Sequence, residues 1–223
     1  MKNILIFVTN HATLGATSEP NGTYAAELTH AVAEFDKAEF QYDLVSIAGG
    51  KAPLYGESDF DDLDHKRVLA DPVFLEKSAA TKKACDINID DYDAVFYPGG
   101  FGLLSDLADN KEVAKLTAEL YENGGVVGAV CHGPAGLLPV VLSSGDTLLS
   151  LKKVTAFTRN EEVAAQTIEK IPFVLEEALL KAADSFSKLD PWQEHVVIDG
   201  RLITGQNPAS AHAVGKAMVS ALR

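Results

Sequence analysis

Cysteine is scarce in this sequence, which contains only Cys85 and Cys131 among 223 residues. A chain of this length with so few thiols is not a disulfide scaffold, and no pair of cysteines or histidines has the spacing of a zinc site. No apolar run approaches the ~20 residues that a membrane-spanning helix needs. The first residues lack the long apolar region and small-residue cleavage site of a signal peptide. We therefore expect a cytoplasmic protein that does not engage membranes and needs no metal or other cofactor.

Basic residues are also few, with 19 lysines and arginines against 32 acidic residues and a formal net charge of −13. An acidic chain repels phosphate backbones, so nucleic-acid binding is disfavoured. Low-complexity tracts and internal repeats are missing as well. The length and this composition predict one domain over residues 1–223.

Strands and helices alternate along the chain. Apolar, β-branched runs predict buried strands, and helical spacing of apolar residues predicts helices between them. The expected strands are residues 3–9, 42–48, 92–97, 126–130 and 153–158. The expected helices are residues 23–35, 110–123, 133–142, 161–170 and 207–222. Residues 195–205 predict a hairpin that turns at Asp199-Gly200. This order predicts a doubly wound α/β fold, with a mostly parallel sheet sandwiched by helices.

Residues 51–90 form an acidic stretch with a weaker pattern. The stretch is too long for a plain connection, so we expect it to contain short helices and to cover part of the molecule. This covering insertion belongs to the same predicted domain.

Cys131 lies in "GGVVGAVCHGPAGLL", at the end of a predicted strand and just before a predicted helix. Ligands of such folds bind beyond the carboxyl ends of the strands. A sharp turn there exposes its central side chain, and the N-terminus of a following helix favours a thiolate, which predicts a lowered pKa for Cys131. The alternative is a buried small hydrophobic residue. Cys85 has no comparable setting and is interpreted as a structural or incidental thiol.

Four motifs, "AVCHGPAGLL", "YPGGFG", "DGRLITGQNPASAHA" and "GTYAAELTHA", together resemble the ThiJ/PfpI superfamily. Within it they are similar to the branch of glyoxalase III-type enzymes and heat-shock-type chaperones. The resemblance spans nearly the whole chain. It implies the flavodoxin-like architecture of the class I glutamine amidotransferase group, and a homodimer.

The resemblance also implies roles for individual residues. Cys131 matches the nucleophile, His132 the histidine that follows it, and Glu27 the glutamate that leans over the thiol. Glu162 matches the acidic partner that orients the histidine. The remaining matches are the oxyanion-hole glycines, Gly99 and Gly100.

Each of these roles has a chemical reason and an alternative. A carboxyl group beside a thiolate should hold its proton more strongly and could shuttle it, which suits Glu27, although a helix residue there could simply be solvated. Glu161 and Glu162 could both be ordinary first-turn acids. We interpret His11, His30, His65 and His195 as ordinary residues and assign no role to His212.

The sequence departs from the pattern of its relatives in one wall of the expected pocket. Relatives often have histidine at Phe101, a small polar residue at Leu103 and tryptophan at Ser105. These changes predict a more apolar pocket and leave the substrate less certain than the nucleophile.

The resemblance implies conversion of methylglyoxal to lactate without glutathione, with a small aldehyde as substrate. Three alternatives stay open: a holdase chaperone or redox sensor, a protein deglycase, and a cysteine peptidase or amidase of the same superfamily.

Overall fold

The central sheet has seven strands in the order β10-β11-β7-β6-β1-β3-β5. The computed structural model describes residues 1–223. Neighbouring strands are parallel, except that β10 and β11 form an antiparallel hairpin. This sheet confirms the predicted doubly wound α/β fold. Its strands are β1 (Asn3–Phe7), β3 (Gln41–Ser46), β5 (Lys82–Lys83), β6 (Ala94–Tyr97), β7 (Val126–Val130), β10 (Val196–Asp199) and β11 (Leu202–Gly205).

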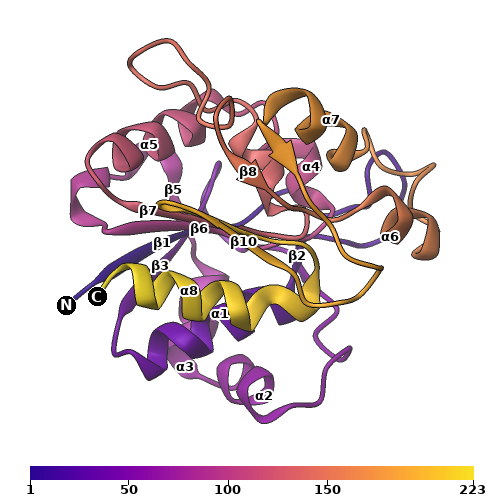
Figure 1. Ribbon diagram of the computed structural model, residues 1–223. Coiled ribbons are helices and arrows are strands. Elements are labelled where there is room, and N and C mark those ends of the chain that lie inside the picture. The colour runs from indigo at the N-terminus through magenta and orange to yellow at the C-terminus, as the bar shows by residue number, and fades with distance from the viewer.

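Helices cover both faces of the sheet (Figure 1). One face packs against the long neighbouring helices α1 and α8, with α2 and α3 further out, and the other packs against α4, α5 and α7. The helices are α1 (Ala25–Lys37), α2 (Leu63–Leu69), α3 (Pro72–Ala79), α4 (Gly102–Asp106), α5 (Lys111–Glu122), α6 (Arg159–Ala164), α7 (Leu175–Ala182) and α8 (Ala211–Ala221). None of them is both long enough and apolar enough to cross a membrane.

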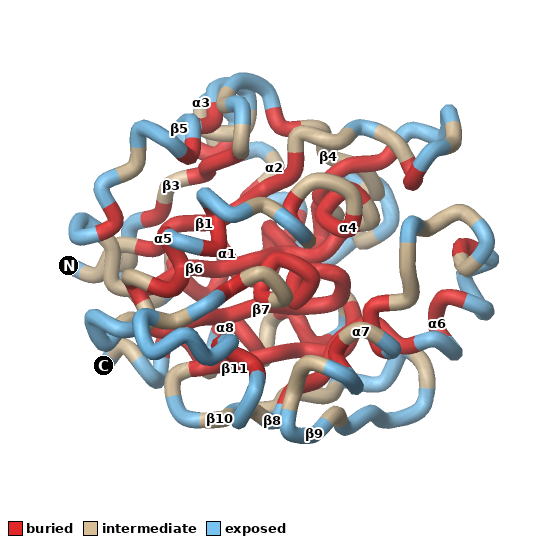
Figure 2. Tube along the Cα trace, turned by 90° about the horizontal axis from the view of Figure 1, so that it is seen from above, coloured by how far each residue is buried: buried red, intermediate tan, exposed pale blue.

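The buried residues follow the central strands (Figure 2). Because β1, β6 and β7 are covered on both faces, their side chains are buried on both sides, which explains their continuous apolar runs. Helix α1 is buried from Ala25 to Phe35, since it lies between the sheet, α8 and α2. Its position places Glu27 and His30 inside the molecule.

The covering segment, residues 51–90, contains the predicted short helices, α2 and α3. It also contributes β4 (Leu54–Tyr55), which pairs with β2 (Thr23–Tyr24) just before α1. This pairing holds the segment against the start of the helix that carries Glu27.

Two expectations about the second half of the chain were wrong. Residues 133–142 do not form an α-helix: only a 3-10 helix, η3 (Gly133–Leu137), follows Cys131. Residues 153–158 add no strand to the central sheet, because β8 (Lys153–Val154) pairs instead with β9 (Ser185–Phe186) in a separate two-stranded sheet. In both places the apolar residues are buried although most of their backbone forms no regular helix and no strand of the central sheet.

Candidate active site

Cys131 occupies a strained turn at the end of β7. Its φ angle is +58°, in the left-handed region that residues with a side chain rarely adopt. The turn is held by two hydrogen bonds: Cys131 donates its N–H to the Gly205 carbonyl at 2.9 Å, and its own carbonyl accepts from the Phe157 N–H at 3.0 Å. Holding such a backbone costs roughly 1–3 kcal/mol, and such strain is concentrated at functional sites. The sharp turn predicted at Cys131 is therefore present, but the expected exposure of its side chain is wrong, since the residue is only 4% exposed.

The side chains of Cys131, His132 and Glu162 form a connected series. Sγ of Cys131 lies 3.3 Å from Nδ1 of His132, and Nε2 of His132 lies 2.7 Å from Oε1 of Glu162. The Thr167 hydroxyl donates to the second oxygen of Glu162. All three members of the series are buried. A carboxylate that accepts the Nε2 proton leaves the Nδ1 lone pair facing the thiol, so Glu162 sets the tautomer that a base needs.

Aromatic rings hold the imidazole of His132 in this orientation. The Phe101 ring centre lies 4.5 Å from that of His132, and the Phe157 ring centre lies 4.7 Å from it. Trp192 packs edge-on against Phe157, with ring centres 5.6 Å apart. The predicted apolar wall at Phe101 is thus the surface that positions the histidine.

Glu27 lies beside the thiol with its carboxyl group completely buried. Neither of its oxygens has a hydrogen-bond partner of normal geometry in the protein, although the Cys131 thiol and the Gly99 amide face it. Burial raises the pKa of Glu27 to about 8. The interpretation of Glu27 as a solvated helix residue is therefore wrong, and the expectation that this group retains its proton agrees with the structure.

The predicted lowering of the Cys131 pKa is wrong. Burial raises the pKa of the thiol well above its usual value, and the nearby carboxyl groups of Glu27, Glu161 and Glu162 raise it further. The expected helix dipole is absent because η3 is only a short 3-10 helix. A thiolate here must form by transfer of the proton to a neighbouring group, and His132 is positioned to receive it.

The glycine turn after β6 contacts both reactive side chains. A Cβ atom on Gly99 would lie 2.0 Å from Oε2 of Glu27 and 2.6 Å from Cβ of Cys131, so only glycine fits. Gly100 has a φ of +118°, which a side chain would strain. The N–H groups of Gly99, Gly100 and His132 donate to no acceptor in the protein at normal geometry. The N–H groups of Gly100 and His132 are therefore not engaged by the protein, whereas the Gly99 N–H faces the carboxyl group of Glu27.

Glu161 and Glu162, adjacent in sequence, point to different groups. Glu161 forms a capping box with Thr158 at the start of α6, as first-turn acids often do. Its Oε1 also accepts hydrogen bonds from the Trp192 N–H at 3.0 Å and from the side-chain amides of Gln206 and Asn207 at 3.1 and 2.8 Å. Glu161 therefore anchors the chain around Trp192 to the Asn-Pro-Ala-Ser motif. The sequence reasoning did not assign this role.

Two tyrosines from the paired strands β2 and β4 also line the site. The rings of Tyr24 and Tyr55 lie 5.0 Å apart, and Tyr55 lies 6.4 Å from Phe101. Burial raises the pKa of Tyr55 well above its usual value, and ionisation of the neighbouring Cys131 or Glu27 would raise it further, so this hydroxyl stays protonated. The sequence predicted that the covering segment, residues 51–90, lies over part of the molecule, but it did not predict that Tyr55 lines the site.

Two residues expected in the pocket wall lie elsewhere. Leu103 is fully buried in the hydrophobic core, and Ser105 lines a separate surface groove beside Leu104 and Ala108. The reason is that α4 starts just after Phe101 and turns these positions away from Cys131. Only Phe101 among the three departures contacts the site.

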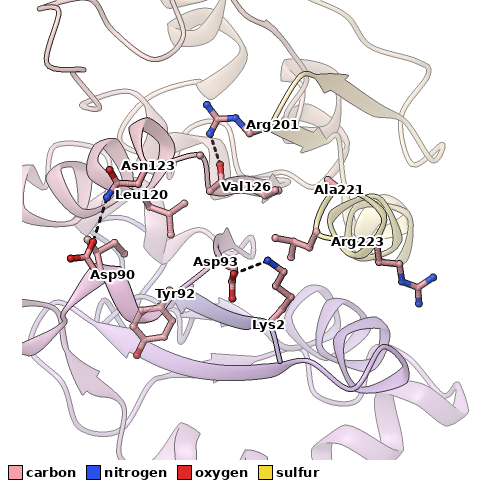
Figure 3. Close-up of a pocket in the computed structure, with 14 residues that line it drawn as sticks. Lys2, Asp90, Tyr92, Asp93, Leu120, Asn123, Val126, Arg201, Ala221 and Arg223 are labelled. Atoms are coloured by element: carbon pink, nitrogen blue, oxygen red, sulfur yellow. Dashed lines mark hydrogen bonds and ion pairs between the residues drawn. The ribbon is translucent and has the colours of Figure 1, made fainter.

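Cys85 is exposed and distant in sequence from every site residue, in agreement with an incidental thiol. A pocket of about 390 Å³ lies near the two termini, and it is lined by Lys2, Asp93, Asn123 and Arg201 among others (Figure 3). Two of its charged groups are engaged, since Lys2 pairs with Asp93 at 2.9 Å and Arg201 donates to the Gly125 carbonyl at 2.8 Å. We assign this pocket no function.

Residues 18–221 match the model of the DJ-1/PfpI family. The chain belongs to the DJ-1/PfpI family. The glutathione-independent glyoxalase HSP31 of Saccharomyces cerevisiae is 33% identical, over 91% of this chain and 90% of that protein. Glyoxalase 3 of Candida albicans is 30% identical, over 99% of this chain and 98% of that protein.

Solved structures agree with this family membership. The Rapid Encystment Protein 24 KDa of Francisella tularensis has a TM-score of 0.94 and 34% identity, with 100% of both chains covered. The crystal structure of glyoxalase III from Candida albicans has a TM-score of 0.87 and 27% identity, covering 100% of this chain and 98% of the other.

Proposed function

We propose that this protein is a glutathione-independent glyoxalase that converts methylglyoxal to lactate. The observation that carries the proposal is the buried series Cys131–His132–Glu162, with the protonated Glu27 on the other side of the same sulfur. Similar proteins of nearly the same length named as glyoxalases support the substrate class, a small aldehyde. The reaction needs no outside oxidant, because one carbon of the substrate is oxidised while its neighbour is reduced.

The first step forms a bond between Sγ of Cys131 and the aldehyde carbon. His132 takes the thiol proton at Nδ1 as this bond forms, and Glu162 stabilises the resulting imidazolium. The aldehyde oxygen becomes an alkoxide, which the N–H groups of Gly99, Gly100 and His132 stabilise. Glu27 then donates its proton to this oxygen and yields a hemithioacetal.

The second step moves hydrogen from one carbon to the next. Glu27, now a carboxylate, removes the proton from the carbon bonded to sulfur, and the imidazolium of His132 protonates the neighbouring ketone oxygen to give an enediol. Glu27 then delivers a proton to the former ketone carbon and receives the one on the hydroxyl beside sulfur. The product is a lactoyl thioester on Cys131, with Glu27 protonated and His132 neutral again.

The last step is hydrolysis. A water molecule activated by His132 attacks the thioester carbon, the C–S bond breaks, and the thiol regains its proton as lactate leaves. The sum is methylglyoxal plus water giving lactic acid. In this scheme Glu27 needs a proton at the start of the cycle, which is the form that its raised pKa maintains at neutral pH.

The test is to supply methylglyoxal without glutathione to the purified wild-type protein, to Cys131→Ser and to the control Cys85→Ser, and to measure D- and L-lactate by chiral assay. We expect wild type and Cys85→Ser to form lactate equally. Cys131→Ser should lose activity by roughly 10³-fold or more, since the alternative nucleophile is far weaker. Lactate formation by Cys131→Ser at the wild-type rate would refute the scheme.

The alternatives predict different results with the same variants. A peptidase or amidase would hydrolyse fluorogenic peptides in a Cys131-dependent way, and a deglycase would release glyoxal adducts from amino groups. A holdase would suppress aggregation of a heated client equally well with Cys131→Ala.

We also propose that the chain is a single domain with the covering segment 51–90 as part of it, and that it acts as a cytoplasmic homodimer without nucleic acid. The net charge of −13 supports the last point. Size-exclusion chromatography with light scattering tests the dimer.

A further inference from the structure

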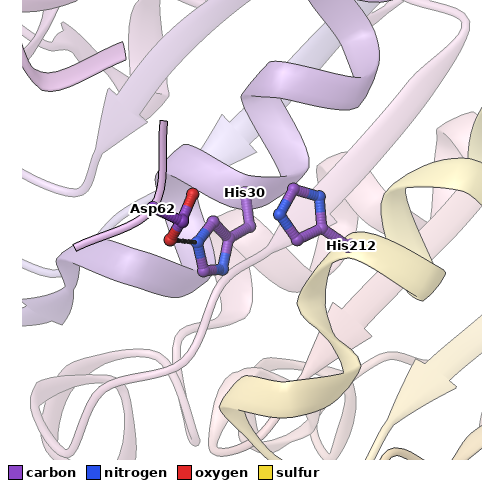
Figure 4. A group of neighbouring side chains, drawn as sticks. All are labelled: His30, Asp62 and His212. Carbon is purple, nitrogen blue, oxygen red and sulfur yellow. Dashed lines mark hydrogen bonds and ion pairs between the residues drawn. The ribbon is translucent and has the colours of Figure 1, made fainter. Parts of the chain in front are cut away.

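A cluster of two imidazoles and a carboxylate lies outside the active site, where three segments meet (Figure 4). His30 comes from α1, Asp62 from the residue before α2, and His212 from the first turn of α8. Nε2 of His30 lies 2.9 Å from Oδ2 of Asp62, and the rings of His30 and His212 stack with centres 4.3 Å apart. The proposed glyoxalase chemistry uses none of these residues.

The separations match a set of metal ligands that needs only a small adjustment. One nitrogen from each histidine and one oxygen from Asp62 lie within 4.8 Å of one another. Ligand atoms about 2.0–2.1 Å from a tetrahedral ion are roughly 3.3 Å apart, which is close to the existing His30–Asp62 distance. Because the ring of His212 stacks on that of His30, the remaining adjustment is a rotation of the His212 side chain, which is 30% exposed.

Neighbouring groups orient two of the three ligands. Nδ1 of His212 lies 2.9 Å from Oε1 of Glu34, and its other ring nitrogen faces His30 and Asp62 (Figure 4). A histidine that donates one ring N–H to a carboxylate and offers the other nitrogen is the usual arrangement of a metal ligand. Asp62 is fixed through its other oxygen, Oδ1, which accepts the His65 N–H at 2.9 Å and caps α2.

The surroundings select this set over the adjacent one. Glu34, Asp64 and His212 also approach one another, but the Lys37 ammonium already bridges Glu34 at 2.9 Å and Asp64 at 2.6 Å. All three members of the set formed by His30, Asp62 and His212 border a pocket of about 590 Å³ that is open to solvent, whereas Glu34 does not border it. An ion could enter there and keep a water molecule as its fourth ligand.

We propose that His30, Asp62 and His212 bind one divalent transition-metal ion of the zinc class. Two imidazoles and one carboxylate are ligands that this class prefers. Coordination displaces the proton that Nε2 of His30 shares with Asp62 and releases it to solvent. The ion joins α1, the covering segment and α8, and it lies one helical turn from Glu27, so its binding stabilises the face of the fold that carries this residue.

The test measures Zn²⁺ binding by isothermal titration calorimetry, with an untagged protein in which Cys85→Ser and Cys131→Ser remove competing thiols. We expect one Zn²⁺ per chain and a rise in Tm that EDTA reverses. In the same background, Asp62→Asn and His212→Gln should each weaken binding at least tenfold. Asparagine still caps α2, so loss of binding in Asp62→Asn is not a folding defect.

His195→Gln is the matched control, because the His195 side chain hydrogen-bonds Ser187 and is not a member of the cluster, and this variant should bind within twofold of its parent. The proposal is overturned if the parent shows no saturable Zn²⁺ binding, or if Asp62→Asn and His212→Gln bind as tightly as the control. Neither result bears on the glyoxalase proposal, which methylglyoxal turnover tests separately.

Discussion

The imidazole of His132 and the carboxylate of Glu162 meet at 2.7 Å, and both side chains are only 1% exposed. A hydrogen bond this well shielded from water is stronger than one at the surface, and it keeps the geometry of the pair. The pair fixes which ring nitrogen of His132 faces Cys131.

Replacement of Glu162 by glutamine should reduce kcat by about 10²–10⁴-fold. The amide can present an N–H to the imidazole and stabilise the wrong tautomer, and it cannot balance an imidazolium charge. The steady-state rate of lactate formation measures the effect. Glu177→Gln, which alters an exposed pair with Arg159, should leave the rate unchanged. Equal rates for both variants would remove Glu162 from the proposed mechanism.

Glu27→Gln should change how stability depends on pH. In the folded protein Glu27 keeps its proton up to about pH 8, whereas the ordinary pKa is 4.5. The folded state therefore binds more protons than the unfolded state between these values, and the free energy of unfolding falls as pH rises, by at most about 1.4 kcal/mol per pH unit.

The glutamine variant lacks this group, so its stability relative to wild type should increase from pH 5 to pH 8. Urea denaturation at each unit of pH provides the measurement. A constant difference across this range would contradict the raised pKa of Glu27.

Gly99→Ala should abolish activity and lower Tm. The added methyl group would overlap Oε2 of Glu27 and Cβ of Cys131, at 2.0 and 2.6 Å, and neither neighbour can move without leaving the site. Gly145→Ala is the control: its φ of +90° makes alanine strained, but no atom lies within 4 Å of the new Cβ. The control should lose stability by roughly 1–2 kcal/mol and keep its kcat. Thermal denaturation and turnover separate the two effects.

Iodoacetamide at pH 7 should label Cys85 faster than Cys131. Cys85 is exposed, whereas Cys131 is 4% exposed and its pKa is raised by burial and by three carboxyl groups. Peptide mass spectrometry over a time course gives the two rates. Faster labelling of Cys131 would mean that its thiolate is stable without substrate, against the proton transfer to His132 proposed above.

Local sequence predicted the framework well, because strand and helix periodicity depends on near neighbours. It predicted β7 at its observed bounds and the turn at Cys131. It placed the hairpin turn one residue too early, because Asp199 pairs with Leu202 and the turn residues are Gly200 and Arg201. The prediction of a helix over residues 133–142 was wrong. These residues are apolar enough for a helix, but only a 3-10 helix forms, and it packs against Tyr97. A Cβ on Gly133 would lie 2.2 Å from the Tyr97 carbonyl oxygen. The spacing of apolar residues along the sequence carries no information about such a contact.

The sequence by itself determined the alternating fold and the elbow cysteine, since each follows from residue type and short spacing. The residues expected beside the cysteine came from the resemblance to the ThiJ/PfpI superfamily. The tertiary structure decided the rest. It separated Glu162 from Glu161, it raised the pKa of Cys131 by enclosing it among carboxyl groups, and it brought His30, Asp62 and His212 together from positions up to 182 residues apart. Burial and electrostatic interaction depend on distance in space, and only the folded chain sets those distances.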